Sequence, residues 1–334
     1  IVRAMGVGAW FPWIHEFVPE RQRGAYFGAE TAIAQLVIIG VTLSYAFVLH
    51  GDPGVNRFFI IYAIGIGAGL FSVLLIFRVP GGHVARRESS VSGWASYRRV
   101  LADREYVVFV SMASLGFAAL AFLGASAILY MRDMIGLSPN VIMAVVTGGG
   151  LSVFLTVRYW TRYAESADPR AAIAMTLGGH GLVAAGFLFL IPTAPWTPVL
   201  IFPAIACANL LSGAFNAIGN GTMLGFVPAH DRVAYTNVWI FGTSLGLGLS
   251  PIAAGLLIGW GGLDGFRACF VISAVLAIVA GMGEWILVAR RHAIPRPLTE
   301  LFSEAQPLRT LARIAWISAG LHESSGRVRP ERTR

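Results

Sequence analysis

The sequence predicts an all-α membrane protein whose nine transmembrane helices belong to an array of six plus six helices. The first observation is composition: 56% of the 334 residues are hydrophobic and 13% are charged, with a mean hydropathy of +0.69. Soluble domains carry roughly 25% charged residues. The second observation is a series of apolar stretches long enough to cross a bilayer. The third is a loop sequence that occurs twice.

Nine stretches of the chain have the length and apolar character of a transmembrane helix. A proline in the connection 132–139, at Ser138-Pro139, is typical of the first position of a helix. The longest internal polar stretch is 80–105, and a polar tail follows Arg290-Arg291. The nine predicted spans are 1–18, 25–49, 57–79, 106–131, 140–160, 171–191, 198–225, 233–259 and 266–289.

The repeated loop reads F-V-P-x-x-x-R-x-A-Y at Phe17–Tyr26 and again, 209 residues later, at Phe226–Tyr235. A repeat of this period between apolar spans indicates two similar bundles in tandem. Proline ends one helix. The arginine can bond helix C-terminal carbonyls or pair with an acid, and the tyrosine falls in the first turn of the next helix. The six residues Pro19, Arg23, Tyr26, Pro228, Arg232 and Tyr235 therefore form either a hinge and latch or a well-capped turn.

The repeat also predicts how the chain divides. The loop at 19–24 would separate the counterparts of the spans 198–225 and 233–259. Three spans precede 198–225 after the polar loop, so three more are expected before Ile1, in a parent protein of twelve helices. The divisions are 1–79, the remainder of an N-terminal bundle (helices four to six); 80–105, a central loop; 106–290, a C-terminal six-helix bundle; and 291–334, a tail.

Arginine placement orients the spans. All 25 basic residues are arginine, and 21 of them lie on the side of the 80–105 loop and the tail, against three on the other side. Cytoplasmic loops carry such an excess, so the central loop and the C-terminus are expected in the cytoplasm. Contact with anionic lipid explains the net charge of +8 without nucleic acid. The absence of lysine, with abundant Ala and Gly, favours a bacterium of high GC content and hence its plasma membrane.

Several other classes of protein find no support. Cys207 and Cys269 both lie in apolar runs, with no CxxC motif or Cys/His cluster, so neither a metal nor another cofactor is expected. An intramembrane enzyme would need a cluster of reactive residues at one depth. His15, Glu30 and His180 are scattered, so the chain is not expected to be an enzyme. The sequence contains no nucleotide-binding P-loop that would support ATP-driven transport.

The six-plus-six array, the long central loop and the P-x-x-x-R-G motif at Pro19–Gly24 resemble the major facilitator superfamily. Arg3–Gly8 is similar to the signature of that family's fourth helix, and Trp160–Arg170 to a degenerate form of its acidic and arginine-rich loop. The resemblance implies a secondary transporter that moves a small solute by alternating access, with a proton as a coupling ion. The alternative is a membrane receptor or scaffold that retains the fold without transporting.

The candidate substrate path lies mainly on the span 198–225. Asn209, Asn216 and Asn220 fall within about 40° of each other on a helix, with Ser212 about 60° to one side. By the resemblance this is the tenth helix, which lines the central cavity. The alternative is that these side chains join helices through hydrogen bonds. Trp10 and Trp13, on the fourth-helix equivalent, either stack on substrate or pack.

Two further residues are candidates for carrying a coupling proton. Glu30 is interpreted as the most deeply placed carboxylate, about 9 Å along its helix from Gly24, unless it pairs with an arginine of the preceding loop. His180 lies near the middle of the span 171–191, on a helix expected at the periphery. Glu284, six residues before Arg290, is interpreted as an interfacial carboxylate.

Overall fold

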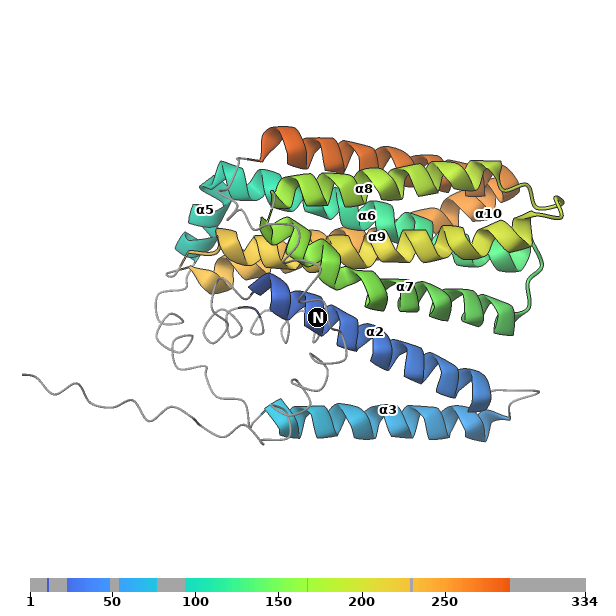
Figure 1. The fold of residues 1–334 in the computed structure, drawn as a ribbon. Helices are drawn as coiled ribbons and strands as arrows, with labels where there is room; N and C mark the ends of the chain where they lie inside the picture. The colour runs from blue at the N-terminus through green and yellow to red at the C-terminus, as the bar shows by residue number, and fades with distance from the viewer. Residues whose placement is uncertain are drawn as a thin grey trace, which may run out of the picture. The chain divides into compact units, whose positions relative to one another are not determined.

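The computed structural model of the chain describes Phe11 and residues 23–48, 54–76, 94–166, 168–228 and 231–288, and every element in this part is helical (Figure 1). The predicted span 1–18 lies outside the described residues apart from Phe11. The elements are α2 (Arg23–Val48), α3 (Val55–Ile76), α5 (Trp94–Ala102), α6 (Arg104–Asp133), α7 (Pro139–Ser166), α8 (Pro169–Gly186), the 3-10 turn η2 (Phe187–Phe189), α9 (Thr197–Phe226) and α10 (Arg232–Leu287).

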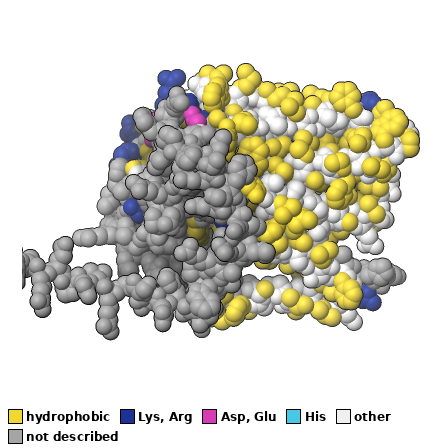
Figure 2. Space-filling model, in the orientation of Figure 1, with side chains coloured by type: hydrophobic (Ala, Val, Ile, Leu, Met, Phe, Trp, Pro, Cys, Tyr) yellow, Lys and Arg dark blue, Asp and Glu magenta, His cyan; other side chains and the backbone are white. Residues whose placement is uncertain are grey.

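Seven of these helices are long and apolar enough to cross a membrane: α2, α3, α6, α7, α8, α9 and α10. Their outward surfaces carry many exposed large hydrophobic side chains, which a bilayer accommodates and water does not. In the view of Figure 2, arginines gather at the end of the bundle that carries α5, while the sides are largely apolar. The chain is therefore an all-α, multi-pass membrane protein.

α10 contains two antiparallel segments. Its 56 residues would extend about 84 Å as one helix, far beyond the roughly 30 Å of a bilayer core. At Gly262 the backbone leaves the helical region, with φ 52° and ψ −123°, and the chain reverses. The Cys269 thiol consequently lies 3.8 Å from the carbonyl oxygen of Ala254. The reversal separates the predicted spans 233–259 and 266–289, while the total of nine stays a prediction.

The bundle is built from neighbouring helix pairs. α6 and α8 both pack along α10, α7 packs along α9, and α2 packs on α7 and α9. Close approach of α10 to α6 depends on Gly242 and Gly246, because a Cβ at either position would meet atoms of Ser114. Such small residues four apart allow helix backbones to approach closely in membranes.

α2 joins the C-terminal helices through a small apolar cluster. Ala32 is 4% exposed and packs with Val153 and Val157 of α7 and Ala217 of α9. Gln35 and Ile39, one and two turns further along α2, lie against Gly150 of α7. The half of the chain before the central loop therefore contacts the half after it through the α2–α7 interface.

The starts of three helices follow the local sequence. Asp103 accepts a hydrogen bond from the backbone N–H of Tyr106 and so caps α6. Asp168 caps α8 in the same way and is followed by Pro169 at the first helical position. The predicted helix start at Pro139 is confirmed as the first residue of α7.

Candidate functional site

The junction between α9 and α10 carries the second copy of the repeated loop and a set of buried polar contacts with α6. The Tyr235 hydroxyl donates to Asp103 Oδ2 at 2.8 Å. In return, the Tyr106 hydroxyl donates to the carbonyl oxygen of Tyr235 at 2.6 Å. The two tyrosine rings lie 4.6 Å apart. The repeat tyrosine thus binds the carboxylate that caps α6, and both hydroxyls are satisfied.

The phenylalanine of the same copy packs on α6 beside these tyrosines. The ring of Phe226 stacks on that of Phe109, with 4.7 Å between the ring centroids. The ring of Trp239 also lies nearly parallel to that of Phe109, with 5.3 Å between the centroids. Phe109 is fully buried. Aromatic pairs at this spacing contribute about 0.5–1.5 kcal/mol beyond the burial of their area. The repeated sequence therefore positions the start of α10 against the start of α6 through both its phenylalanine and its tyrosine.

An ion pair connects the central loop to the same junction. Arg99 of α5 donates from Nε and Nη2 to the two carboxylate oxygens of Asp231, at 2.9 and 2.8 Å. The Asp231 side chain is 4% exposed, and that of Arg99 is 52% exposed. The hydrogen bond to Asp231 raises the pKa of the Arg99 guanidinium, so the pair stays charged at neutral pH.

A further hydrogen bond joins α5 to α10, from Asn237 Nδ2 to the Tyr97 hydroxyl at 2.9 Å. We use the name α5 clamp for these contacts together: Arg99–Asp231, Tyr97–Asn237 and Tyr235–Asp103. The residues come from α5, from the start of α6, which directly follows α5 in the sequence, and from the start of α10, which lies more than 100 residues further on. The clamp therefore holds the central loop helix, the start of α6 and the start of α10 in one arrangement.

The two copies of the repeated loop are not equivalent at the position of the clamp carboxylate. Asp231 corresponds to Gln22 in the first copy. Arg232 is half-buried, and its Nε has no hydrogen-bond partner in the described part of the chain. The ion pair to α5 is made by its neighbour Asp231.

The remaining gate residues have simpler positions. Tyr26 is half-buried and meets Phe27 edge to face at 5.5 Å. Pro228 follows the end of α9 and is half-buried. Pro19 and the side chain of Arg23 lie outside the described residues.

The asparagine stripe of α9 separates into two groups. Asn209 packs its amide against Gly149 of α7, where any Cβ would collide with it. Asn216 accepts a hydrogen bond from Asn220 Nδ2 at 2.9 Å, and Asn220 Oδ1 accepts one from Trp239 Nε1 at 3.3 Å. Asn216 is exposed, whereas Asn220 is half-buried. The hydroxyl of Ser212 donates to the carbonyl oxygen of Ala208 at 2.7 Å within the helix.

The predicted proton carriers differ in burial from expectation. Glu30 is exposed on α2, and its depth in the membrane stays a prediction. Glu284 was interpreted as interfacial, but it is 0% exposed. His180 is 1% exposed, and its ring faces the backbone carbonyls of Ala119 and Ala208. Trp10 and Trp13 lie outside the described residues.

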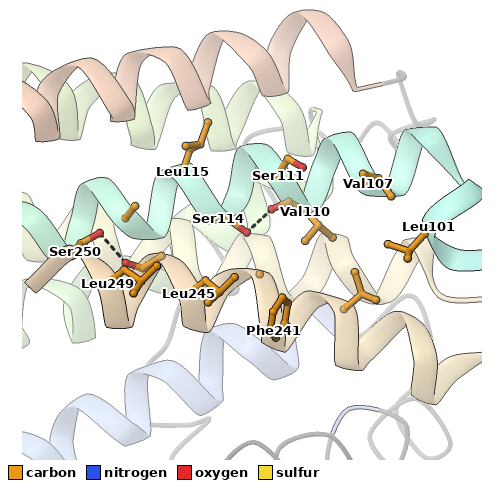
Figure 3. A pocket seen from close by; sticks show the side chains of 14 residues that line it. Leu101, Val107, Val110, Ser111, Ser114, Leu115, Phe241, Leu245, Leu249 and Ser250 are labelled. Atoms are coloured by element: carbon orange, nitrogen blue, oxygen red, sulfur yellow. Dashed lines mark hydrogen bonds between the residues drawn. The ribbon is translucent and has the colours of Figure 1, made fainter. Parts of the chain in front are cut away.

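A groove of about 590 Å³ runs between α6 and the first segment of α10 (Figure 3). Two of the three serine hydroxyls in its lining are satisfied within their own helices: Ser114 donates to the carbonyl oxygen of Val110 at 2.6 Å and Ser250 to that of Gly246 at 2.7 Å. The third serine is Ser111. The rest of the lining is almost entirely apolar and includes Phe241, Leu245 and Leu249. No residue of the asparagine stripe lines it. The groove therefore suits an apolar surface rather than a polar solute.

These observations define a polytopic helical membrane protein with a polar clamp at one end of its bundle. No model of a known protein family matches the chain, and no curated protein matches it.

Proposed function

We propose that the chain belongs to a secondary transporter of the major facilitator type, which moves a small solute across the plasma membrane of a bacterium by alternating access. The observation that carries this proposal is the relation between the repeated loop and the packing of α2. In the proposed six-plus-six arrangement, α2 and the first segment of α10 are equivalent helices in the two halves. Each follows one copy of the loop directly.

Corresponding positions of the two helices differ in burial, and the proposed arrangement accounts for this difference. With the 209-residue offset of the repeat, Ala32 of α2 corresponds to Phe241 of α10. Ala32 is 4% exposed against α7, whereas Phe241 is 67% exposed beside the apolar groove. A two-fold relation between the halves would cover Phe241 with a transmembrane helix of the first half, as α7 covers Ala32. The proposed interface between the halves is thus two-sided, as rocking of one half against the other requires.

The α5 clamp has a place in this function. In the proposed orientation, α5 and both repeated loops face the cytoplasm, in agreement with the excess of arginine at that end. The clamp ties the central loop to the hinge that precedes α10. Rearrangement of this end during the transport cycle would require the Arg99–Asp231 pair to break or to move as a unit.

The substrate is proposed to be polar or amphipathic and uncharged overall. Asn209, Asn216 and Asn220 offer amides, which donate and accept hydrogen bonds without carrying charge. Asn216 is the most accessible of the three, and its amide N–H group donates no hydrogen bond among the described residues. It is therefore the residue of the stripe best placed to meet a solute.

The test uses the protein reconstituted in proteoliposomes. A panel of small polar solutes is screened by thermal stabilisation, and each stabilising solute is then assayed for uptake. Loss of one hydrogen bond costs about 0.5–1.5 kcal/mol, so Asn216→Ala should weaken solute binding roughly threefold to tenfold. Asn140→Ala, at the exposed start of α7, is the matched control. Binding without any uptake would contradict transport and favour a receptor that retains the fold.

A further inference from the structure

Glu284 is a carboxylate in the apolar interior of the bundle. Ala280, one turn before it on the same face of α10, and Val288, directly after the end of α10, are 0% and 3% exposed and belong to the apolar core. Glu284 itself is 0% exposed. Neither of its carboxylate oxygens has a hydrogen-bond partner among the residues that the structure describes.

The neighbouring helices surround this position closely. Gly281 lies against Ala174 and Leu177 of α8, and Gly283 lies against Met112 of α6. A Cβ at Gly281 would be 3.2 Å from the carbonyl oxygen of Ala174. The face of α10 that carries Glu284 is therefore held between two helices at distances that leave little room for a hydration shell.

The charged and titratable groups on these elements are engaged elsewhere or lie at other positions. Arg170, at the start of α8, donates to Asp168 and to the carbonyl oxygen of Val288, and its guanidinium lies over Trp285 at 5.5 Å. The Tyr106 hydroxyl of α6 donates to Tyr235. The other such groups on the facing segments are Arg104 and Glu105, in the first turn of α6, and His180, in the middle of α8. Glu284 forms no ion pair with any of them in the described part.

An ionised carboxylate in this position would have no counter-ion among the described residues, and the close packing of the helices leaves little room for water. Burial of an unpaired charge in an apolar environment is so costly that the group is neutralised instead. Protonation turns the acceptor-only carboxylate into a group that can donate to a backbone carbonyl. Burial at this position therefore favours the protonated, neutral form of the Glu284 side chain.

We propose that Glu284 is a proton-binding site: it carries a proton as a carboxylic acid while α6, α8 and α10 are packed together. The proton bonds to a carboxylate oxygen on binding and passes to water when water enters between these helices. No other bond changes. If the proposed transport function holds, Glu284 rather than Glu30 or His180 would carry the coupling proton of the C-terminal half. Only this coupling role rests on the proposed function.

Infrared spectroscopy of the full chain in lipid at neutral pH tests the proposal without a transport assay. A protonated carboxylic acid has a carbonyl stretch separate from the bands of ionised carboxylates, and a buried one shifts slowly in deuterated water. We expect this slowly exchanging band in the wild-type protein and its loss in Glu284→Gln. Glu105→Gln, in the half-buried first turn of α6, and Glu30→Gln, on the exposed face of α2, are the controls and should keep it.

Retention of the band in Glu284→Gln, or its absence from the wild-type protein, would overturn the proposal. Should Glu284→Gln fail to fold, wild-type protein labelled with carbon-13 at the glutamate carboxyl provides the second measurement. The slowly exchanging band must then shift with the label, and a band that does not shift is equally contrary. A failed uptake assay would count against transport while leaving the infrared result intact.

Discussion

The close contact between α6 and α10 predicts opposite effects for two glycine substitutions on the same helix. A Cβ at Gly246 would collide with the carbonyl oxygen of Ser114 and lie 3.0 Å from the backbone nitrogen of Ala118. Both atoms belong to the backbone, so no side-chain rotation relieves the contact. A Cβ at Gly248, half a turn further along α10, would meet nothing within 4 Å. Gly246→Ala should therefore push the two helices apart, and Gly248→Ala should not.

The magnitude follows from two opposing effects. Overpacking of a tight interface costs about 1–3 kcal/mol, whereas alanine in place of glycine inside a helix gains about 0.8–1.0 kcal/mol. Only the gain applies to Gly248→Ala, while both apply to Gly246→Ala. The difference in unfolding free energy between the two variants should thus be about 1–3 kcal/mol, with Gly246→Ala the less stable. Gly242→Ala should lie between them, because the atoms that its Cβ would meet, Ser114 Oγ and Val110 Cγ1, belong to side chains.

The assay is reversible unfolding in mixed detergent micelles, followed by circular dichroism for the three variants and the wild-type protein. Removal of the hydroxyl in Gly242→Ala/Ser114→Ala should restore part of the stability lost in Gly242→Ala, as a double-mutant cycle would measure. Equal stabilities of Gly246→Ala and Gly248→Ala would refute the close approach of α6 and α10. A Gly246→Ala variant more stable than Gly248→Ala would refute it more strongly.

Two further predictions concern the clamp and the orientation. Tyr235→Phe removes the hydrogen bond to the Asp103 carboxylate and should lower the unfolding free energy by about 1.5–3 kcal/mol. The control, Tyr45→Phe on the outward face of α2, should change the unfolding free energy by less than about 0.5 kcal/mol. Equal effects of the two substitutions would contradict the role of the clamp. In a background with Cys207 and Cys269 replaced by alanine, cysteines introduced at Ser90 and Asp133 test the arginine asymmetry: an impermeant thiol reagent added to intact cells should label only position 133, and labelling of position 90 alone would reverse the orientation.

The membrane-spanning elements could be predicted from sequence because their signal is spread over many residues. The predicted spans 106–131, 140–160 and 198–225 lie within α6, α7 and α9, and the span 171–191 covers most of α8 and the 3-10 turn η2 that follows it. They could be predicted because a transmembrane helix must be long and apolar over its whole length. The α5 helix was not predicted, since it is short and lies in a stretch interpreted as a loop. Ser96 and Val100, its two buried residues, stand four apart, which is the one local signal that could have indicated it.

The site residues were harder to predict because burial of a single side chain depends on neighbours far away in the sequence. Glu30 and Glu284 each stand within an apolar helix, and nothing local distinguishes them. Their burial differs because the face of α10 with Glu284 is enclosed by α6 and α8, whereas the side of α2 with Glu30 has no such cover among the described residues. Spacing likewise placed three asparagines on one face of α9, but their partners are on two helices: Gly149 on α7 and Trp239 on α10.

The difference between the two copies of the repeated loop has a physical consequence for the proposed cycle. Both copies retain the proline, arginine and tyrosine, but only the second has an aspartate beside its arginine, and that aspartate receives Arg99 of the central loop. Gln22 in the first copy has no charge with which to form the same pair. The central loop can therefore stabilise one arrangement of the α9–α10 hinge without an equal effect on the hinge before α2. In the proposed transporter, the two halves would then differ in how easily the loops before α2 and α10 rearrange, and Asp231 is the residue to which we attribute that difference.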